Sequence, residues 1–169
     1  HNSSKKSSEH GLLADFMLAC GSQSWDDGAM LYDTVVITGA SSGFGEAFAR
    51  CIAKQVRDRS ALHMVLVARS ADKLQALAAE LEEQYQCRVQ VCACDLADSA
   101  ARSQLLSLLV TLGGRHMLLI NNAGLGDYGE FCSSEPERNR RMIEVNMTAL
   151  VELTRAMLPA MQEAHQAYV

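Results

Sequence analysis

Three glycines and two serines follow a threonine in the segment Thr38–Gly45, which reads Thr-Gly-Ala-Ser-Ser-Gly-Phe-Gly. An apolar run precedes this segment, and apolar residues recur at helical spacing after it. Glycine lets a backbone bend sharply and approach a bulky anion, and the first N–H groups of a helix have no partner within that helix. The segment therefore predicts a phosphate-binding turn between a strand and a helix. The alternative is a glycine-rich turn that serves packing alone.

A cation stands where the next apolar strand ends. Arg69 follows Ala68 at the end of this strand, about 30 residues beyond Gly39. An acidic side chain at such a position would accept hydrogen bonds from the ribose hydroxyls of NAD, whereas the guanidinium fork suits a 2′-phosphate. The residue type favours NADP(H) as the cofactor. The alternative is an exposed arginine that opens a helix.

A carboxylate follows the third strand. Asp95 and Leu96 end this apolar run, and a carboxylate together with the next backbone N–H can hydrogen-bond an adenine edge. Asp98 is a second acid nearby, but its position before a helical pattern indicates an N-cap.

Two adjacent asparagines follow the fourth strand. Packing alone does not explain Asn121 and Asn122, because amide groups need hydrogen-bond partners. Ala123 and Gly124 come next and are small enough for a ligand to approach the backbone. These four residues predict a further wall of the same site.

The elements that position these motifs alternate between strand and helix. Strands are expected at 34–38, 62–68, 88–94 and 117–121, and helices at 43–56, 71–85, 98–112 and 136–165. Ser134–Glu137 reads as a capping box with proline in the first turn. This alternation predicts an α/β fold, a doubly wound parallel sheet of the Rossmann-like type with strand order 3-2-1-4. Ala167–Val169 opens a fifth strand, so we expect the sheet to be incomplete at that strand.

In this order and at these separations, the motifs resemble the N-terminal part of the short-chain dehydrogenase/reductase family, in its smaller single-domain branch, over about residues 31–169. The resemblance implies an oxidoreductase that transfers hydride between NADP(H) and a small-molecule carbonyl or alcohol substrate. By resemblance, the cofactor-binding residues are Gly39, Ser41, Ser42, Gly43, Phe44, Gly45, Arg69, Asp95, Leu96, Asn122, Ala123 and Gly124. Asn146, within Glu-Val-Asn-Met, resembles the asparagine that helps to hold a water in the family's proton relay. Its alternative role is that of a polar residue tolerated in a helix.

The chain departs from the family at its chemistry. The family uses a serine after the fifth strand and a Tyr-x-x-x-Lys pair on the next helix, but no tyrosine of this chain has lysine four residues on. We therefore expect a C-terminally truncated chain that binds nucleotide without turnover. A non-catalytic nucleotide-binding or interaction module is the alternative. A methyltransferase ranks lower, because Arg69 stands where such enzymes usually carry an acid.

Composition excludes several other classes. The 169 residues carry 15 Lys+Arg against 20 Asp+Glu, so we expect no nucleic-acid partner. No run reaches the about 18 apolar residues of a membrane span, which favours a cytoplasmic protein without a membrane partner. Six cysteines lack the spacing of a disulfide framework, and we expect Cys92 and Cys94 to pack in the core rather than to bind metal.

The two ends of the chain carry further expectations. Residues 1–29 read as a poorly ordered extension, or one resembling a tag, and residues 30–169 as the nucleotide-binding domain. At the other end, we expect the fourth strand to present an unpaired edge. The last helix would leave apolar side chains uncovered, namely Met142, Val145, Leu153 and Met157. We therefore expect marginal stability or self-association of this chain and, by resemblance, a homo-oligomer of the complete protein.

Overall fold

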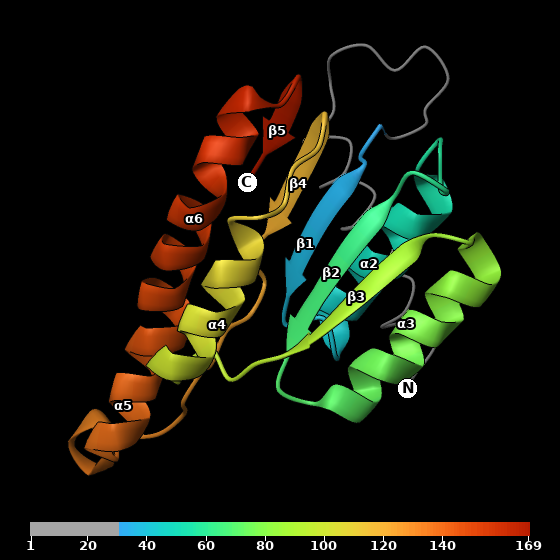
Figure 1. Ribbon diagram of the computed structural model, residues 1–169. Helices are drawn as coiled ribbons and strands as arrows, with labels where there is room; N and C mark the ends of the chain where they lie inside the picture. The colour runs from blue at the N-terminus through green and yellow to red at the C-terminus, as the bar shows by residue number, and fades with distance from the viewer. Residues whose placement is uncertain (1–30) are drawn as a thin grey trace.

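Five parallel strands form one sheet in the computed structural model, which describes residues 31–169 (Figure 1). The predicted extension at 1–29 lies outside the described residues. The strand order is β3-β2-β1-β4-β5, so the predicted order is confirmed. The strands are β1 (Thr34–Thr38), β2 (His63–Ala68), β3 (Arg88–Ala93), β4 (His116–Ile120) and β5 (Gln166–Tyr168).

Helices cover both faces of this sheet, because its central strands are apolar on both sides. Val35 and Ile37 of β1 pack in one core with α2 (Gly43–Gln55) and α3 (Ala71–Tyr85). Val36, between them, points to the opposite face and packs with α4 (Ser99–Leu109) and α6 (Leu150–Glu163). The two-residue period of the strand thus distributes β1 between two cores, as expected for a parallel sheet buried on both faces.

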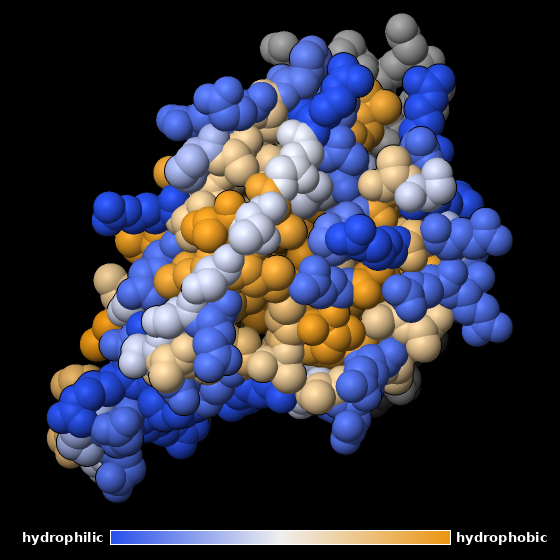
Figure 2. Space-filling model, viewed as in Figure 1, coloured by the Kyte–Doolittle hydropathy of each residue, from blue (hydrophilic) through white to orange (hydrophobic). Residues whose placement is uncertain are grey.

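Helix α4 covers its face of the sheet only in part. Figure 2 shows a weakly polar stripe along α4 with hydrophobic side chains on either side of it. Leu106, Leu108 and Leu112 are half-buried against the core on this face. The edge strand β3 is likewise half-buried along most of its length.

One predicted helix start is confirmed and one is wrong. The Asp98 carboxylate accepts hydrogen bonds from the N–H groups of Ala100 and Ala101, at 2.8 and 3.3 Å, and so caps α4. The predicted capping box at Ser134 does not form. The Ser134 hydroxyl instead donates to the Phe131 carbonyl at 2.8 Å, because residues 131–133 form a 3₁₀ turn, η1. Helix α5 (Pro136–Ile143) consequently begins without a side-chain cap.

The predicted last helix is three elements. The π-helical turn η2 (Glu144–Ala149) separates α5 from α6 (Leu150–Glu163). The chain then pairs β5 in parallel with β4, with Gln166, Ala167 and Tyr168 opposite residues 116–118. The expectation of an unpaired β4 edge is therefore wrong over residues 116–118, where the three residues of β5 pair with it.

The last helix has two apolar stripes, and the residues that were expected to be uncovered belong to the stripe that faces the core. Val145, Leu153 and Met157 are buried in the core beneath α4, and Met142 is half-buried. The exposed stripe carries other side chains, namely Ile143, Met147, Leu150, Val151 and Leu158. Both stripes have helical spacing, so only the docking of the helix onto the sheet distinguishes them.

The structure also bears on the expectations about the cysteines and about membrane spans. Cys94 is buried and Cys92 packs against the same core, as predicted. Within residues 31–169, no cluster of three His, Cys, Asp or Glu side chains is arranged to hold a metal ion. The helices of this part of the chain are all too short or too polar to cross a membrane.

Candidate functional site

A cavity of about 300 Å³ opens where strands β1 to β4 end. The glycine-rich turn, Arg69, the Asp95 loop and the asparagine segment line it together, although they are far apart in sequence. The predicted residues in its wall are Gly39, Ser41, Ser42, Phe44, Arg69, Asp95, Leu96, Asn122, Ala123 and Gly124. The residues that the sequence analysis did not assign to it are Ala68, Ser70, Cys94, Leu125 and Val145. Parallel strands bring their carboxyl ends to one edge, so four separate motifs meet there.

The glycine turn packs against itself on one side and is open on the other. Gly39 and Gly43 have φ of 68° and 58°, a backbone region that side chains rarely adopt. A Cβ on Gly45 would collide with the Gly39 carbonyl, whereas a Cβ on Gly43 would meet no atom within 4 Å. Gly45 thus allows the close approach of helix to turn, and Gly43 leaves space at the helix N-terminus.

The N-terminus of α2 offers its backbone N–H groups to this space. Its N-cap, Ser42, is extended, with φ of −169°, and its side chain makes no capping hydrogen bond. An uncapped helix start presents N–H donors and the positive end of the helix dipole, a combination that suits a phosphate. The turn therefore presents the backbone donors that a phosphate group requires.

The threonine ahead of the glycines joins two strands. Thr38 is buried, and its hydroxyl oxygen accepts from the N–H groups of Asn122 and Ala123 at 3.0 and 2.9 Å. The Asn122 side chain returns a hydrogen bond to the Thr38 carbonyl at 2.9 Å. The other amide, that of Asn121, donates to the Thr154 hydroxyl on α6 at 3.0 Å. Both asparagine side chains therefore have protein partners, and Asn122 holds the glycine turn against β4.

Arg69 and Asp95 lie in the wall of this same cavity. One Asp95 oxygen accepts from the Ala97 N–H at 3.0 Å, and the other pairs with Arg141 of α5 at 2.8 Å. Burial acts to raise the pKa of Asp95, but the hydrogen bonds from Arg141 and Ala97 and the charges of Arg141 and Arg69 outweigh it and lower this pKa. The carboxylate is therefore charged at neutral pH, and each oxygen can accept a further hydrogen bond.

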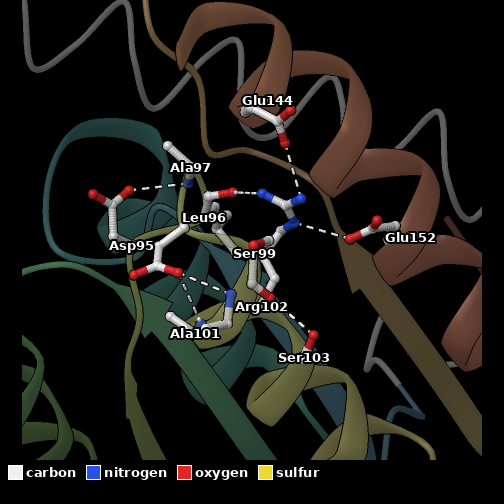
Figure 3. A network of polar contacts seen from close by, with 11 residues as sticks. Asp95, Leu96, Ala97, Ser99, Ala101, Arg102, Ser103, Glu144 and Glu152 are labelled. Atoms are coloured by element: carbon white, nitrogen blue, oxygen red, sulfur yellow. Dashed lines mark hydrogen bonds and ion pairs between the residues drawn. The ribbon is translucent and has the colours of Figure 1, made fainter. Parts of the chain in front are cut away.

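A buried arginine that the sequence analysis missed supports this part of the cavity (Figure 3). Arg102 is 4% exposed and donates to the Leu96 carbonyl at 2.7 Å. It also pairs with Glu144 and Glu152, each at 2.9 Å. Burial opposes its charge, yet the two carboxylates raise the pKa of Arg102 above its ordinary value. Its spacing four residues after the Asp98 cap placed it in a helix, but nothing local to the sequence marked it as buried.

Asn146 lies just outside the cavity lining, in η2. Its side chain forms two hydrogen bonds with the backbone of Leu125: the Leu125 N–H donates to Oδ1, and Nδ2 donates to the Leu125 carbonyl, both at 2.8 Å. Asn146 thus fixes the segment after Gly124 at the end of β4. Gly43 and Gly45 of the turn are likewise not among the residues that line the cavity.

Comparison with known proteins relates the whole described region to one family. A family model described as short chain dehydrogenase matches residues 33–169. Dehydrogenase/reductase SDR family member 7B of Bos taurus is 36% identical over 140 residues, which cover 80% of this chain and 42% of that protein. Very-long-chain 3-oxoacyl-CoA reductase of Homo sapiens is 28% identical, with 80% and 43% covered.

Solved structures agree with this relationship. A short-chain dehydrogenase from Sphingobium yanoikuyae in complex with NADPH has a TM-score of 0.68 at 36% identity, covering 77% of this chain and 48% of that one. L-sorbose reductase from Gluconobacter frateurii, complexed with NADPH and L-sorbose, has a TM-score of 0.69 at 31% identity, covering 81% and 50%. The chain spans less than half the length of the two curated relatives and about half that of the two solved chains.

Proposed function

Because this chain belongs to the short-chain dehydrogenase family, we propose that it is the nucleotide-binding portion of an NADP(H)-dependent oxidoreductase. The observation that carries the proposal is the single cavity shared by the glycine turn, Arg69 and the Asp95 loop. Relatives solved with NADPH share this fold at identities of 31–36%. The substrate is a small-molecule carbonyl or alcohol.

Different residues of the site would contact different parts of the cofactor. The turn from Gly39 to Gly45 and the N-terminus of α2 would hold the pyrophosphate. Arg69 would pair with the 2′-phosphate of the adenosine, where its five donors match phosphate oxygens. Asp95 and Leu96 would flank the adenine, and the segment from Asn122 to Gly124 would lie beside the adenosine ribose. The cavity is lined by small side chains there, so backbone can approach the ligand.

The chemistry is divided between cofactor and protein. When bound, NADPH supplies the hydride. The residues of this chain bind and orient it, and Asn146 holds the Leu125 backbone at the edge of the site. A proton donor and its lysine are the other requirement in this family, and these 169 residues contain no tyrosine with lysine four positions on. We expect this segment to bind NADPH and to show no carbonyl reduction by itself.

An Arg69→Asp variant tests the cofactor assignment. It should weaken NADPH binding by about 1.5–3 kcal/mol, the contribution of a charged hydrogen bond, and spare NADH. Titration of each nucleotide with the purified chain measures both dissociation constants. The matched control is Arg88→Asp, which makes the same charge change at the start of β3, at the opposite end of the sheet. An equal loss for NADPH and NADH would make Arg69 a structural residue and overturn the preference for NADP(H).

A further inference from the structure

Among residues 31–169, one charged side chain is buried, and it contacts one residue of the cavity wall and the sequence neighbour of another. Arg102 extends from α4 between the loop after β3 and the π-helical turn η2 (Figure 3). Its Nη1 donates to the Leu96 carbonyl at 2.7 Å, and its Nη2 pairs with Glu144 at 2.9 Å. Leu96 lines the cavity directly, and Glu144 immediately precedes Val145, which also lines it.

The contact with Glu144 reaches further around the site. Glu144 is the first residue of η2, and Asn146 of the same turn holds the Leu125 backbone by two hydrogen bonds. Leu125 is also part of the cavity wall. One guanidinium thus connects Leu96 to the turn that carries Val145 and that holds Leu125 through Asn146. π-helical turns are uncommon and concentrate at functional sites, so the position of this one bears on the site.

Stability alone is a weak explanation for this arrangement. Moving a cation out of water is costly, and a buried ion pair often contributes little net stability. Glu144 and Glu152 are each about 40% exposed, so water could solvate both carboxylates without Arg102. The contact with Glu152 would by itself connect α4 to α6. The contacts with Leu96 and Glu144 instead point to the cavity wall.

We propose that Arg102 is a positioning residue that sets the spacing between Leu96 and the η2 turn, and thereby the width of the cavity where the adenosine end of the nucleotide would lie. The inference rests on the proposed function. Arginine suits this role because its planar fork donates in several fixed directions at once. A lysine ammonium keeps the charge but cannot hold three partners in these directions.

An Arg102→Lys variant tests the inference by nucleotide binding in the full chain. The dissociation constant for NADPH should rise about tenfold, because displaced residues of the cavity wall would no longer contact the nucleotide in the right orientation. The matched control is Arg50→Lys. Arg50 likewise pairs with two glutamates, Glu46 and Glu80, but between α2 and α3 and outside the cavity wall. The dissociation constant of the Arg50→Lys variant for NADPH should stay within about twofold of that of the wild-type chain.

Amide hydrogen exchange in the nucleotide-free chain gives a second readout. Arg102→Lys should speed exchange in the loop after β3 and in η2, while the central strand β1 stays as protected as in the wild type. Arg50→Lys should leave both segments unchanged. Uniform acceleration across the sheet in Arg102→Lys would indicate loss of global stability and would contradict a local positioning role.

A pair of glutamate variants keeps the test decisive if Arg102→Lys does not fold. Glu144→Gln should weaken NADPH binding about threefold, whereas Glu152→Gln should change it less than about twofold, because only Glu144 adjoins the cavity wall. Equal effects of the two variants overturn the inference. Unchanged affinity in Arg102→Lys, with normal binding by the wild type, also overturns it and leaves the proposed function standing. Absence of NADPH binding by the wild-type chain overturns both.

Discussion

At the scale of single residues, the three glycines of the turn serve two different purposes. Gly43 and Gly39 adopt positive φ, whereas Gly45 serves close packing. The three glycines therefore meet two requirements, a positive φ and close packing. The number of glycines alone reveals neither requirement, since glycine-rich turns also occur without a ligand.

A Gly45→Ala variant measures the packing requirement. The new methyl group would collide with the Gly39 carbonyl, so the free energy of unfolding should fall by about 1–3 kcal/mol, the usual cost of overpacking. Urea denaturation of the chain measures it. Gly126→Ala is the control, because a Cβ at Gly126 meets nothing within 4 Å and its φ is not positive. Equal losses in both variants would show that close approach to the Gly39 carbonyl is not what makes Gly45 necessary.

The Asp95–Arg141 pair predicts how stability varies with pH. Arg141 helps to keep the pKa of Asp95 below its ordinary value, so the folded state binds a proton less readily than the unfolded state. The stabilisation is therefore complete above the ordinary carboxyl pKa of about 3.9 and is lost as pH falls through the lower folded value. Both side chains are more than a third exposed, so solvent screens the pair and the effect is small.

The measurement compares wild type with Asp95→Asn. Wild type should be the more stable of the two at pH 7, and the difference should shrink toward zero as pH falls below about 3.9. Urea unfolding at a series of pH values follows it. Arg141→Gln should reduce the pH dependence without abolishing it, since the Ala97 N–H and the charge of Arg69 still lower the pKa of Asp95. A difference that stays constant from pH 7 to pH 3 would contradict the assigned cause.

At the scale of elements, helix starts show how a local signal succeeds or fails. Asp98 caps α4 with two backbone hydrogen bonds, as its position before the apolar pattern predicted. Ser134 carries an equally good local signal, but its hydroxyl donates to the carbonyl of Phe131 in the 3₁₀ turn η1. Ser70 precedes α3 and makes no capping hydrogen bond. The residue type before a helix thus does not by itself decide whether a side-chain cap forms.

Comparison of two N-caps turns this observation into a prediction. Asp98→Ala should lower the free energy of unfolding by about 1 kcal/mol, the usual cost of a lost cap. Ser70→Ala should leave it nearly unchanged, because the Ser70 side chain donates and accepts no capping bond at α3. Thermal or urea unfolding measures both variants. A loss at Ser70 as large as that at Asp98 would mean that propensity, and not the hydrogen bond, accounts for the cost.

At the scale of the whole molecule, the exposed apolar stripe of the last helix is the main unsatisfied surface within residues 31–169. Ile143, Met147, Val151 and Leu158 lie four or seven residues apart, Leu150 adjoins Val151, and all five are 42–62% exposed. They belong to α5, η2 and α6. Such a strip is a favourable surface for contact with another apolar face.

We expect the chain to associate with itself through this stripe. Changing Val151 and Leu158 together to lysine should shift the association to higher protein concentration, because two charges would have to be buried at the contact. Sedimentation velocity over a range of concentrations measures the shift. Val110→Lys is the control, since Val110 is 60% exposed at the end of α4, away from the stripe. A monomeric wild-type chain at all concentrations would contradict the expectation.

The sequence by itself determined the order of elements, the parallel sheet and the four segments that meet at its carboxyl edge. These depend on local patterns: apolar runs make strands, the three-to-four-residue period makes helices, and alternation of the two makes a parallel sheet. Residue type and local sequence position were sufficient to identify Asp98, Arg69 and the glycine turn. Parallel topology then brought the motifs together without further information.

Only the tertiary structure decided which of two apolar stripes faces the core, where the last helix widens into a π turn, and that Arg102 is buried. The burial of Arg102 depends on Glu144 and Glu152, which lie more than 40 residues away in the sequence. Helical periodicity marks both stripes equally, and an arginine in an amphipathic helix is normally exposed. Burial of a charge becomes favourable only when distant carboxylates and a carbonyl converge on it, and that convergence is a property of the packed molecule.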